Sequence, residues 1–160
     1  MTYTLVKSVL KINISPKQHG FIPGRSVFTN FLELSNQVTE AFQQGVQIDV
    51  VYFDLKKAFD SVDHCLLIDK LRRFGIQGSI LQWFKSYLTD WSQVVSVSGN
   101  TLFPINVTSG IAQGSRLGPL LFAVFINDLY DVVKHSNLHL FADDSRLSKT
   151  ITSFQDARLT

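Results

Sequence analysis

The sequence has a single cysteine, almost no net charge and no long apolar run. Cys65 can form no disulfide within the chain and no cysteine-based metal site, which is typical of a reducing compartment, and we expect it to be a small buried residue. The 15 basic residues exceed the 13 acidic residues by only two. Because nucleic-acid binding depends on local clusters of positive charge, this balance neither demands nor excludes it.

No segment approaches the ~18 consecutive apolar residues that a membrane-spanning helix needs. The N-terminal part also lacks an apolar stretch with a cleavage site, so we expect no secretory signal and no membrane partner. The compartment is expected to be intracellular, either the cytoplasm, the nucleus or both.

Apolar residues make up 45% of the chain and phenylalanine occurs 13 times, which indicates a folded chain. A length of 160 residues suits one domain with a real core. Because there is no repeat, low-complexity tract or linker, we expect one continuous piece of a domain, which need not be the whole of that domain.

The first part of the chain predicts loops, one helix and one strand. We expect a short helix or an extended lead-in over residues 1–17, and a loop over residues 18–26 where glycines and a proline gather. Apolar residues at helical spacing predict a helix over residues 28–44, with Gly45 as its C-cap. The expected apolar face of this helix comprises Phe31, Leu34, Val38, Ala41 and Phe42.

The strand is predicted over residues 48–55, which read IDVVYFDL. This nearly continuous run of β-branched and aromatic residues predicts a buried central strand. Asp54 is its last candidate for an inward-facing position. Because a buried carboxylate is costly unless it is paired or bound to metal, Asp54 is more informative than an aspartate in a loop.

Two helices are expected next, over residues 64–74 and 80–88, the first of them ended by Gly75. The expected N-caps are Ser61 or Asp63 for the first helix and Ser79 for the second. Asp60, Asp63 and His64 also invite interpretation as metal ligands, but the adjacent helix start accounts for them more simply.

A hairpin and a glycine-rich loop complete the middle of the chain. Residues 93–98 and 103–108 predict two strands around Gly99-Asn100. Residues 109–119, which read SGIAQGSRLGP, open a helix with Pro119 in its first turn. Glycine backbone and the Gln113 amide can approach a nucleotide closely. The loop matches neither the Walker A nor the dinucleotide fingerprint, so its specificity as a bare pattern is low.

Residues 138–149 predict a strand, a turn and a return strand, with the sequence FADD at residues 141–144. A pair of adjacent aspartates is more often a solvated turn than a site. A third carboxylate on a neighbouring strand would favour a metal site, and Asp54 supplies it. Carboxylates on adjacent strands can hold two divalent cations about 4 Å apart, and hard cations such as Mg²⁺ prefer oxygen ligands.

At these residues the sequence resembles reverse transcriptases. The segment YFDLKKAFDSV at residues 52–62 is similar to motif A, GIAQGS at residues 110–115 to motif B, and FADD at residues 141–144 to motif C. The segments QHGF at residues 18–21 and GPLLF at residues 118–122 resemble the non-LTR (LINE-like, jockey-type) retrotransposon branch. The ordered set of motifs is far more specific than any one of them.

The resemblance implies a metal centre with two Mg²⁺ ions, for which Mn²⁺ could substitute. Asp54 and Asp143 would be the bridging ligands and Asp144 would support them. The Leu55 carbonyl could also contact metal. These carboxylates are the catalytic residues that the resemblance implies.

The resemblance also implies contacts to substrates. The backbone amides of Lys57 and Ala58 would meet the triphosphate, and Phe59 would stack beneath the sugar and exclude a 2′-hydroxyl. Without the motif, Phe59 would be interpreted as a plain core aromatic. Gln113 and Gly114 would line the nucleotide pocket. Arg25 is the candidate contact to the template backbone.

We therefore predict an α+β fold, a reverse-transcriptase palm with an antiparallel sheet and packed helices. It would carry partial fingers over about residues 1–47, the palm over about residues 48–160, and no thumb. The predicted function is RNA-directed DNA polymerisation, with an RNA template, a DNA primer and deoxynucleoside triphosphates as partners. Two alternatives stay open: a truncated inactive relic, and a nucleic-acid-binding module that keeps the palm fold.

Overall fold

The computed structural model describes residues 13–153 and 156, so most of the predicted lead-in, residues 1–12, lies outside the described residues. The chain divides into two compact units, each of which we describe by itself. We call Lys57–Phe125 the insert unit, because residues of the other unit precede and follow it. We call Ile14–Lys56 together with residues 126–153 and 156 the sheet unit.

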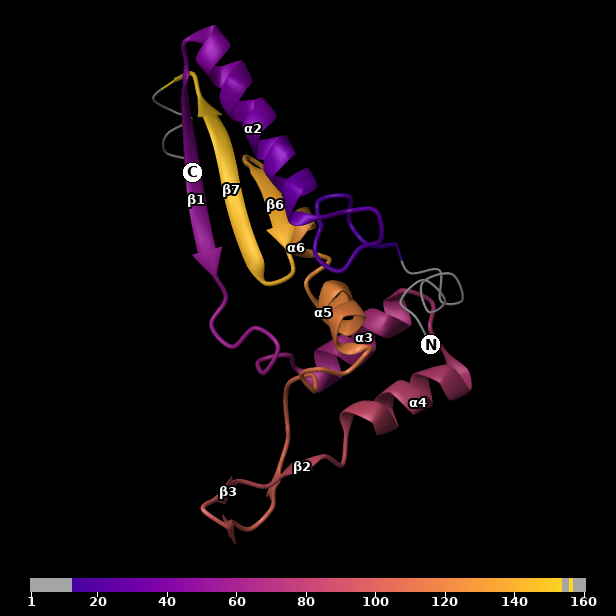
Figure 1. Ribbon diagram of the computed structural model, residues 1–160. Helices are drawn as coiled ribbons and strands as arrows, with labels where there is room; N and C mark the ends of the chain where they lie inside the picture. Colours follow the sequence, from indigo (N-terminus) through magenta and orange to yellow (C-terminus); the bar gives the residue numbers. More distant parts are fainter. Residues whose placement is uncertain (1–12, 154–155, 157–160) are drawn as a thin grey trace. The chain divides into compact units, whose positions relative to one another are not determined.

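The sheet unit contains a three-stranded antiparallel sheet in the order β1-β7-β6 (Figure 1). Its strands are β1 (Gln47–Asp54), β6 (Asn137–Phe141) and β7 (Asp144–Ile151). The strand-turn-strand predicted around FADD is therefore confirmed as β6 and β7. A short helix, α6 (Leu129–Val132), precedes β6.

The prediction that residues 48–55 form a buried central strand is wrong about position. β7 is the central strand, and β1 pairs only with β7 among the described residues. The last four residues of β1, including Asp54, are exposed. An apolar run predicts that a strand forms, but it does not predict whether that strand has one neighbouring strand or two. Edge and central strands share the same local preferences.

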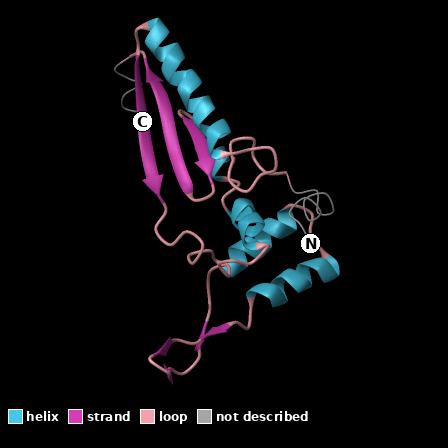
Figure 2. Ribbon diagram, viewed as in Figure 1, coloured by secondary structure: helices cyan, strands magenta, loops and turns pink. Residues whose placement is uncertain are grey.

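Helix α2 (Val27–Gln44) packs along the sheet (Figures 1 and 2). Ser26 begins it with a capping box completed by Thr29, and Gly45 ends it in the left-handed conformation at φ 65°, as predicted. The predicted apolar face is only partly correct, since Leu34 and Ala41 are buried whereas Phe31, Val38 and Phe42 are exposed. Asn30 is buried in their place because its Nδ2 donates to the Leu140 carbonyl at 3.2 Å, a long-range contact that periodicity cannot indicate.

The insert unit is built from three helices: α3 (His64–Arg73), α4 (Gly78–Leu88) and α5 (Gly118–Phe125). Helix α3 packs against both others. Asp63 caps α3 by accepting from the Leu66 amide at 2.7 Å, which confirms one of the two predicted caps. Helix α4 begins at Gly78 after Gln77, so the prediction of Ser79 as its cap is wrong.

Apolar side chains at helical spacing form the core of the insert unit. Its fully buried members include Val62, Leu67, Leu71, Leu120, Leu121 and Val124. Cys65 is exposed, contrary to the prediction, because it lies off the α3 stripe of Leu67, Ile68 and Leu71.

The predicted hairpin forms, but its strands are short. Strands β2 (Ser92–Gln93) and β5 (Ile105–Asn106) pair, as do β3 (Ser96–Val97) and β4 (Asn100–Thr101). The turn lies at Ser98 and Gly99, one residue earlier than expected, with φ of 50° and 81°. Two positive φ angles are the pattern of a type I′ turn. Among the described residues, no helix combines the length and apolar character needed to cross a membrane.

Candidate active site

The three carboxylates among the predicted metal ligands lie at one end of the sheet. Asp54 is the last residue of β1 and stands directly opposite Asp144, the first residue of β7. Asp143 precedes it in the turn. Because residues directly opposite in an antiparallel pair project to the same face, the side chains of Asp54 and Asp144 share one face of the sheet. Asp54 and Asp144 are exposed and Asp143 is half-buried.

The turn that carries Asp143 has a defined backbone conformation. Phe141 pairs with Asp144, so Ala142 and Asp143 form a two-residue connection. Ala142 has a φ of 56°, and Asp143 is not among the residues with positive φ. A positive φ at the first central residue alone is the pattern of a type II′ turn, which usually has glycine there. Ala142 therefore adopts a strained conformation that needs support from its surroundings.

Gln18 supplies that support through its side-chain amide. Its Oε1 accepts from the Gly20 amide at 2.8 Å and from the Ala142 amide at 3.0 Å, while its Nε2 donates to the Ala142 carbonyl at 3.4 Å. Gln18 is buried. A Cβ added to Gly20 would lie 2.1 Å from the Ala142 nitrogen, so only glycine fits there. The sequence predicts a loop over residues 18–26 but not this role, and its one signal was the resemblance of QHGF at residues 18–21 to the retrotransposon branch.

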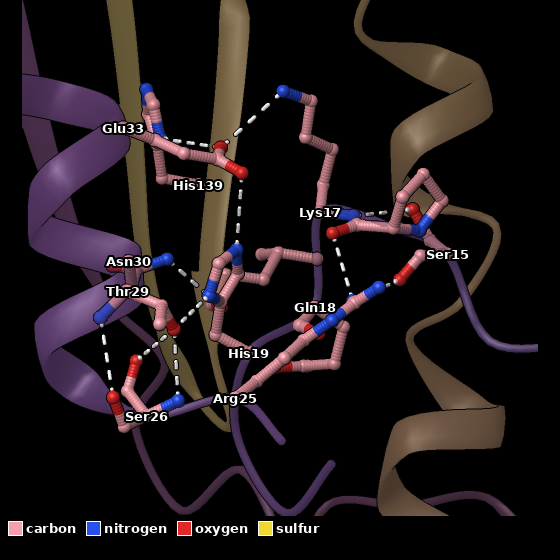
Figure 3. A network of polar contacts seen from close by, with 12 residues as sticks. Ser15, Lys17, Gln18, His19, Arg25, Ser26, Thr29, Asn30, Glu33 and His139 are labelled. Atoms are coloured by element: carbon pink, nitrogen blue, oxygen red, sulfur yellow. Dashed lines mark hydrogen bonds and ion pairs between the residues drawn. The ribbon is translucent and has the colours of Figure 1, made fainter. Parts of the chain in front are cut away.

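A polar network around Glu33 holds the start of α2 against β6 (Figure 3). Lys17 Nζ lies 3.4 Å from Glu33 Oε2, and His19 Nε2 lies 3.3 Å from Oε1. His139 Nδ1 lies 3.7 Å from Glu33 Oε2. His19 also pairs through Nδ1 with the Thr29 hydroxyl at 2.9 Å.

Both histidines of this network are buried, and burial lowers their pKa values because it disfavours the charged imidazolium. The nearby Glu33 carboxylate opposes this effect in each case. His19 is thus a packing residue of the sheet unit.

Arg25, the candidate template contact, is engaged within the sheet unit. Its Nη1 donates to the carbonyl oxygens of Ser15, Pro16 and Gln18 at 3.2, 2.8 and 2.6 Å. These bonds fasten the loop that precedes α2 (Figure 3). A contact to template stays a prediction.

The predicted nucleotide contacts all lie in the insert unit. Here the motif A turn and the motif B loop are joined by backbone hydrogen bonds, from the Ile111 amide to the Phe59 carbonyl at 3.0 Å and from the Gly110 amide to the Val62 carbonyl at 2.8 Å. A Cβ on Gly110, whose φ is 94°, would lie 2.9 Å from Asp60 Cα. Glycine is therefore required where these two segments meet.

Side chains of the insert unit reinforce this junction. The Phe59 ring stacks on Phe122, with ring centroids 4.4 Å apart. Gln113 Nε2 donates to Asp60 Oδ1 at 3.3 Å. The backbone turns at Lys57 and Gly114 through positive φ angles of 52° and 78°.

Asp60 and His64, weighed earlier as metal ligands, take structural roles beside the same loop. Asp60 Oδ1 accepts from Gln113, and His64 Nε2 lies 2.6 Å from the Gly110 carbonyl. A hollow of about 500 Å³ adjoins them, lined also by Tyr87, Trp91 and Asn106.

The carboxylates at the sheet end fit a hard divalent cation by their donor chemistry, because all three offer oxygen. Among residues 13–153 and 156, no group of three or more histidine, cysteine, aspartate or glutamate side chains is placed to hold a metal ion. The backbone register brings the donors to one strand end.

Residues 1–153 match the family model described as reverse transcriptase (RNA-dependent DNA polymerase). The chain belongs to the reverse transcriptase family. It is 35% identical over 112 residues to a probable RNA-directed DNA polymerase from transposon BS of Drosophila melanogaster. That alignment covers 70% of this chain and 12% of the relative.

Other similar proteins also come from retrotransposons. The chain is 31% identical over 100 residues to a Pol polyprotein from retrotransposable element R2 of Popillia japonica, covering 62% of this chain and 16% of that one. It is 32% identical over 94 residues to the polymerase of mobile element jockey from Drosophila melanogaster, covering 59% of this chain and 10% of that one. The predicted resemblance to reverse transcriptases of non-LTR (LINE-like, jockey-type) retrotransposons is confirmed by these relatives.

A comparison with a solved structure also agrees with the predicted fold. Telomerase from Candida albicans, solved with a fragment of telomeric RNA, superposes with a TM-score of 0.65 at 13% identity, covering 89% of this chain and 28% of that one. At this identity the match shows the fold alone, and it confirms the predicted α+β reverse-transcriptase class. The chain spans between 10 and 16% of the length of these three retrotransposon relatives.

Proposed function

We propose that the chain carries the polymerase centre of a non-LTR retrotransposon reverse transcriptase, which adds deoxynucleotides to a DNA primer 3′-end on an RNA template. One observation supports this most directly: Asp54 stands opposite Asp144 in the sheet, with Asp143 in the adjoining turn. Reverse transcriptases bind nucleic-acid templates and generally use divalent metal ions, which is the chemistry that these donors suit.

In this proposal Asp54 and Asp143 would be the principal ligands of two Mg²⁺ ions, or of Mn²⁺ ions in their place, with Asp144 in support and the Leu55 carbonyl as a further donor. When bound, such ions activate a primer hydroxyl and neutralise the leaving pyrophosphate. The protein's part is to hold the carboxylates at one strand end. The clamp that Gln18 and Gly20 make on Ala142 supports this, because it fixes the backbone from which Asp143 projects.

The insert unit would bind the incoming nucleotide. The amides of Lys57 and Ala58 are proposed to meet the triphosphate, and Gln113 and Gly114 to line the pocket. The Phe59 ring is proposed to support the sugar and to exclude a 2′-hydroxyl. Its stacking on Phe122 supports this role, since a ring fixed on one face is a rigid platform on the other. Arg25 would contact the template backbone.

The test is Asp54→Asn, which keeps the shape of the side chain and removes its charge. Primer extension on an RNA template with Mg²⁺ should fall by at least about 100-fold, the scale of losing one electrostatic contributor to a reaction centre. Asp49→Asn is the matched control, because Asp49 lies on the same strand and its carboxylate, among the described residues, bonds only to the nearby Gln47, at 2.6 Å.

RNA affinity, measured in parallel, separates the remaining alternatives. If the wild-type chain binds RNA but extends no primer, it is a nucleic-acid-binding module. If it neither binds RNA nor extends a primer, it is an inactive relic. Equal extension by wild type and Asp54→Asn would contradict the proposed catalytic centre.

A further inference from the structure

Arg146 lies on β7, the central strand of the sheet unit, and is only 7% exposed. Its guanidinium carbon lies 4.6 Å from the ring centroid of Phe31 and 5.8 Å from that of Tyr52. The structure records no hydrogen bond or ion pair between the Arg146 side chain and any described residue, and its Nη1 is buried without a hydrogen-bond partner. Aromatic rings attract a guanidinium, but they supply no oxygen to accept its hydrogen bonds.

Arg146 differs from the other buried polar groups without a hydrogen bond in having no recorded carboxylate beside it. His19 Nε2 and His139 Nδ1 are also buried without a hydrogen bond, yet each faces the Glu33 carboxylate, at 3.3 and 3.7 Å. Arg146 cannot lower the free-energy cost of burying its charge by losing a proton, because a guanidinium stays charged in proteins. A buried cation of this kind needs an anion within reach.

The sheet register places two carboxylates, those of Asp144 and Asp54, on the same face as Arg146. Tyr52 of β1 and His139 of β6 stand opposite Arg146, and Asp144 lies two residues before it on the same strand. Residues two apart on a strand face the same side, about 6.6 Å apart, which an arginine side chain spans easily. Asp54, opposite Asp144, shares that face.

A hollow joins these groups. Asp54, Asp144 and Arg146 all line one cavity of about 400 Å³ beside α2, with the rings of Phe31, Tyr52 and Phe141 forming its apolar wall. The guanidinium-bearing residue and both carboxylate residues therefore line the same space.

We propose that Arg146 is a positioning residue and the resident counter-ion of the Asp54–Asp144 pair. It competes with divalent cations for these carboxylates and, without metal, reduces the repulsion between two like charges that stand opposite across the sheet. The inference rests on the proposed function, since it takes this carboxylate pair to be the metal site. It assigns to Arg146 a control over metal affinity.

The test compares two substitutions of Arg146 in the 160-residue chain. Arg146→Met keeps the length and apolar stem but removes the charge, and Arg146→Lys keeps the charge but weakens the ring contact. Mn²⁺ binding is measured from the signal of free Mn²⁺ in electron paramagnetic resonance. We expect Arg146→Met to bind Mn²⁺ about tenfold more tightly. The repulsion between the guanidinium and a divalent ion held by carboxylates of the same cavity has a free energy of about that order. Arg146→Lys should stay within about threefold of wild type.

A second readout does not depend on activity. Without metal, Arg146→Met should melt at a lower temperature when the two carboxylates lose their counter-ion, and saturating Mn²⁺ should raise its melting temperature more than it raises that of wild type. Should Arg146→Met not fold, Arg146→Gln serves instead, because it keeps a polar head in the hollow.

The outcomes separate this inference from the function on which it rests. If wild type binds Mn²⁺ and Asp54→Asn does not, the metal site stands; equal affinity in wild type and Arg146→Met then overturns the role of Arg146 alone. If wild type binds no Mn²⁺, the metal part of the proposed function fails, and this inference fails with it.

Discussion

Gln18 and Gly20 act on a turn 124 and 122 positions further along the chain, as the hydrogen bonds of Gln18 with Ala142 and the close approach of Gly20 show. Both residues look like ordinary loop residues in the sequence. Their partner is a backbone segment, and no local pattern indicates which segment a loop will contact. Sequence reasoning could therefore identify Asp143 as a candidate, but not the residues that hold its backbone.

Gly20→Ala should be among the most destabilising single substitutions in the sheet unit. The new Cβ would lie 2.1 Å from the Ala142 nitrogen and 2.8 Å from its Cα, so the backbone before Asp143 must move. We expect a loss of about 3 kcal/mol, the upper end for overpacking against atoms that cannot yield. Chemical denaturation measures this loss.

Gly24→Ala is its control, because a Cβ at Gly24 would meet nothing within 4 Å and only the φ of 78° opposes alanine. That strain should cost about 1–2 kcal/mol. Equal losses in the two variants would contradict the close approach at Gly20.

The two buried histidines should make stability depend on pH. Burial lowers the pKa of His19 and of His139 from about 6.5, so the unfolded chain binds protons more readily than the folded one as the pH falls. Their stabilising contribution is complete above about pH 6.5 and is lost as the pH falls through the folded-state pKa values. The slope can reach about 1.4 kcal/mol per pH unit for each group.

Urea unfolding at pH 7.5 and pH 5.5 measures this dependence. His139→Gln should reduce it, whereas His135→Gln, which changes an exposed histidine, should not. A wild-type midpoint that is the same at both pH values would contradict the prediction.

At the scale of elements, what the sequence could predict was local. The ends of α2 and α3 follow from Gly45, Gly75 and Asp63, whose preferences depend on one turn of backbone. The order of the strands depends on pairing across the whole chain, and there the prediction of a central β1 failed. The buried face of α2 also differs from the predicted one. The hydrogen bond from Asn30 to the Leu140 carbonyl places Asn30 on that face.

The strands should differ strongly in hydrogen exchange. β7 bonds to a neighbour on each side, whereas β2 to β5 are two-residue strands with exposed side chains, Phe103 nearby being 92% exposed. We expect the amides of β7 to be the most protected and most amides of residues 92–106 to exchange near unprotected rates. The expected exception is Leu102, whose amide bonds to the Val95 carbonyl at 2.9 Å. Comparable protection in β7 and β3 would contradict this.

At the scale of the whole molecule, the ordered motifs identified the family, and the family match confirmed it. The predicted boundary between fingers and palm near residue 47 stays a prediction. The two compact units divide the chain instead after Lys56 and after Phe125, so the metal-ligand candidates fall in the sheet unit and the nucleotide candidates in the insert unit. Motif spacing carries no information about such a division, because each motif is defined by chemistry and not by packing.

Both tryptophans, Trp83 and Trp91, lie in the insert unit, so tryptophan fluorescence reports on that unit. Leu67→Ala, in the insert unit, should shift the fluorescence midpoint in urea, with a cost of about 2–5 kcal/mol for a fully buried leucine. Leu140→Ala, in β6, should shift the circular-dichroism midpoint more than the fluorescence midpoint. Identical shifts by both probes in both variants would show that the two units unfold as one.

The residues of the insert unit lie between β1 and β7 in the sequence. During synthesis on the ribosome, β1 therefore emerges well before the strand with which it pairs. The residues that pair between these strands are 90 to 104 positions apart, which corresponds to about 5–20 s of translation. During that time the insert unit emerges whole, whereas β1, with Val51 and Phe53 on it, has no strand to pair with among the described residues already made. The nascent chain is therefore most prone to aggregate, and most dependent on a chaperone, between the emergence of β1 and the arrival of β7.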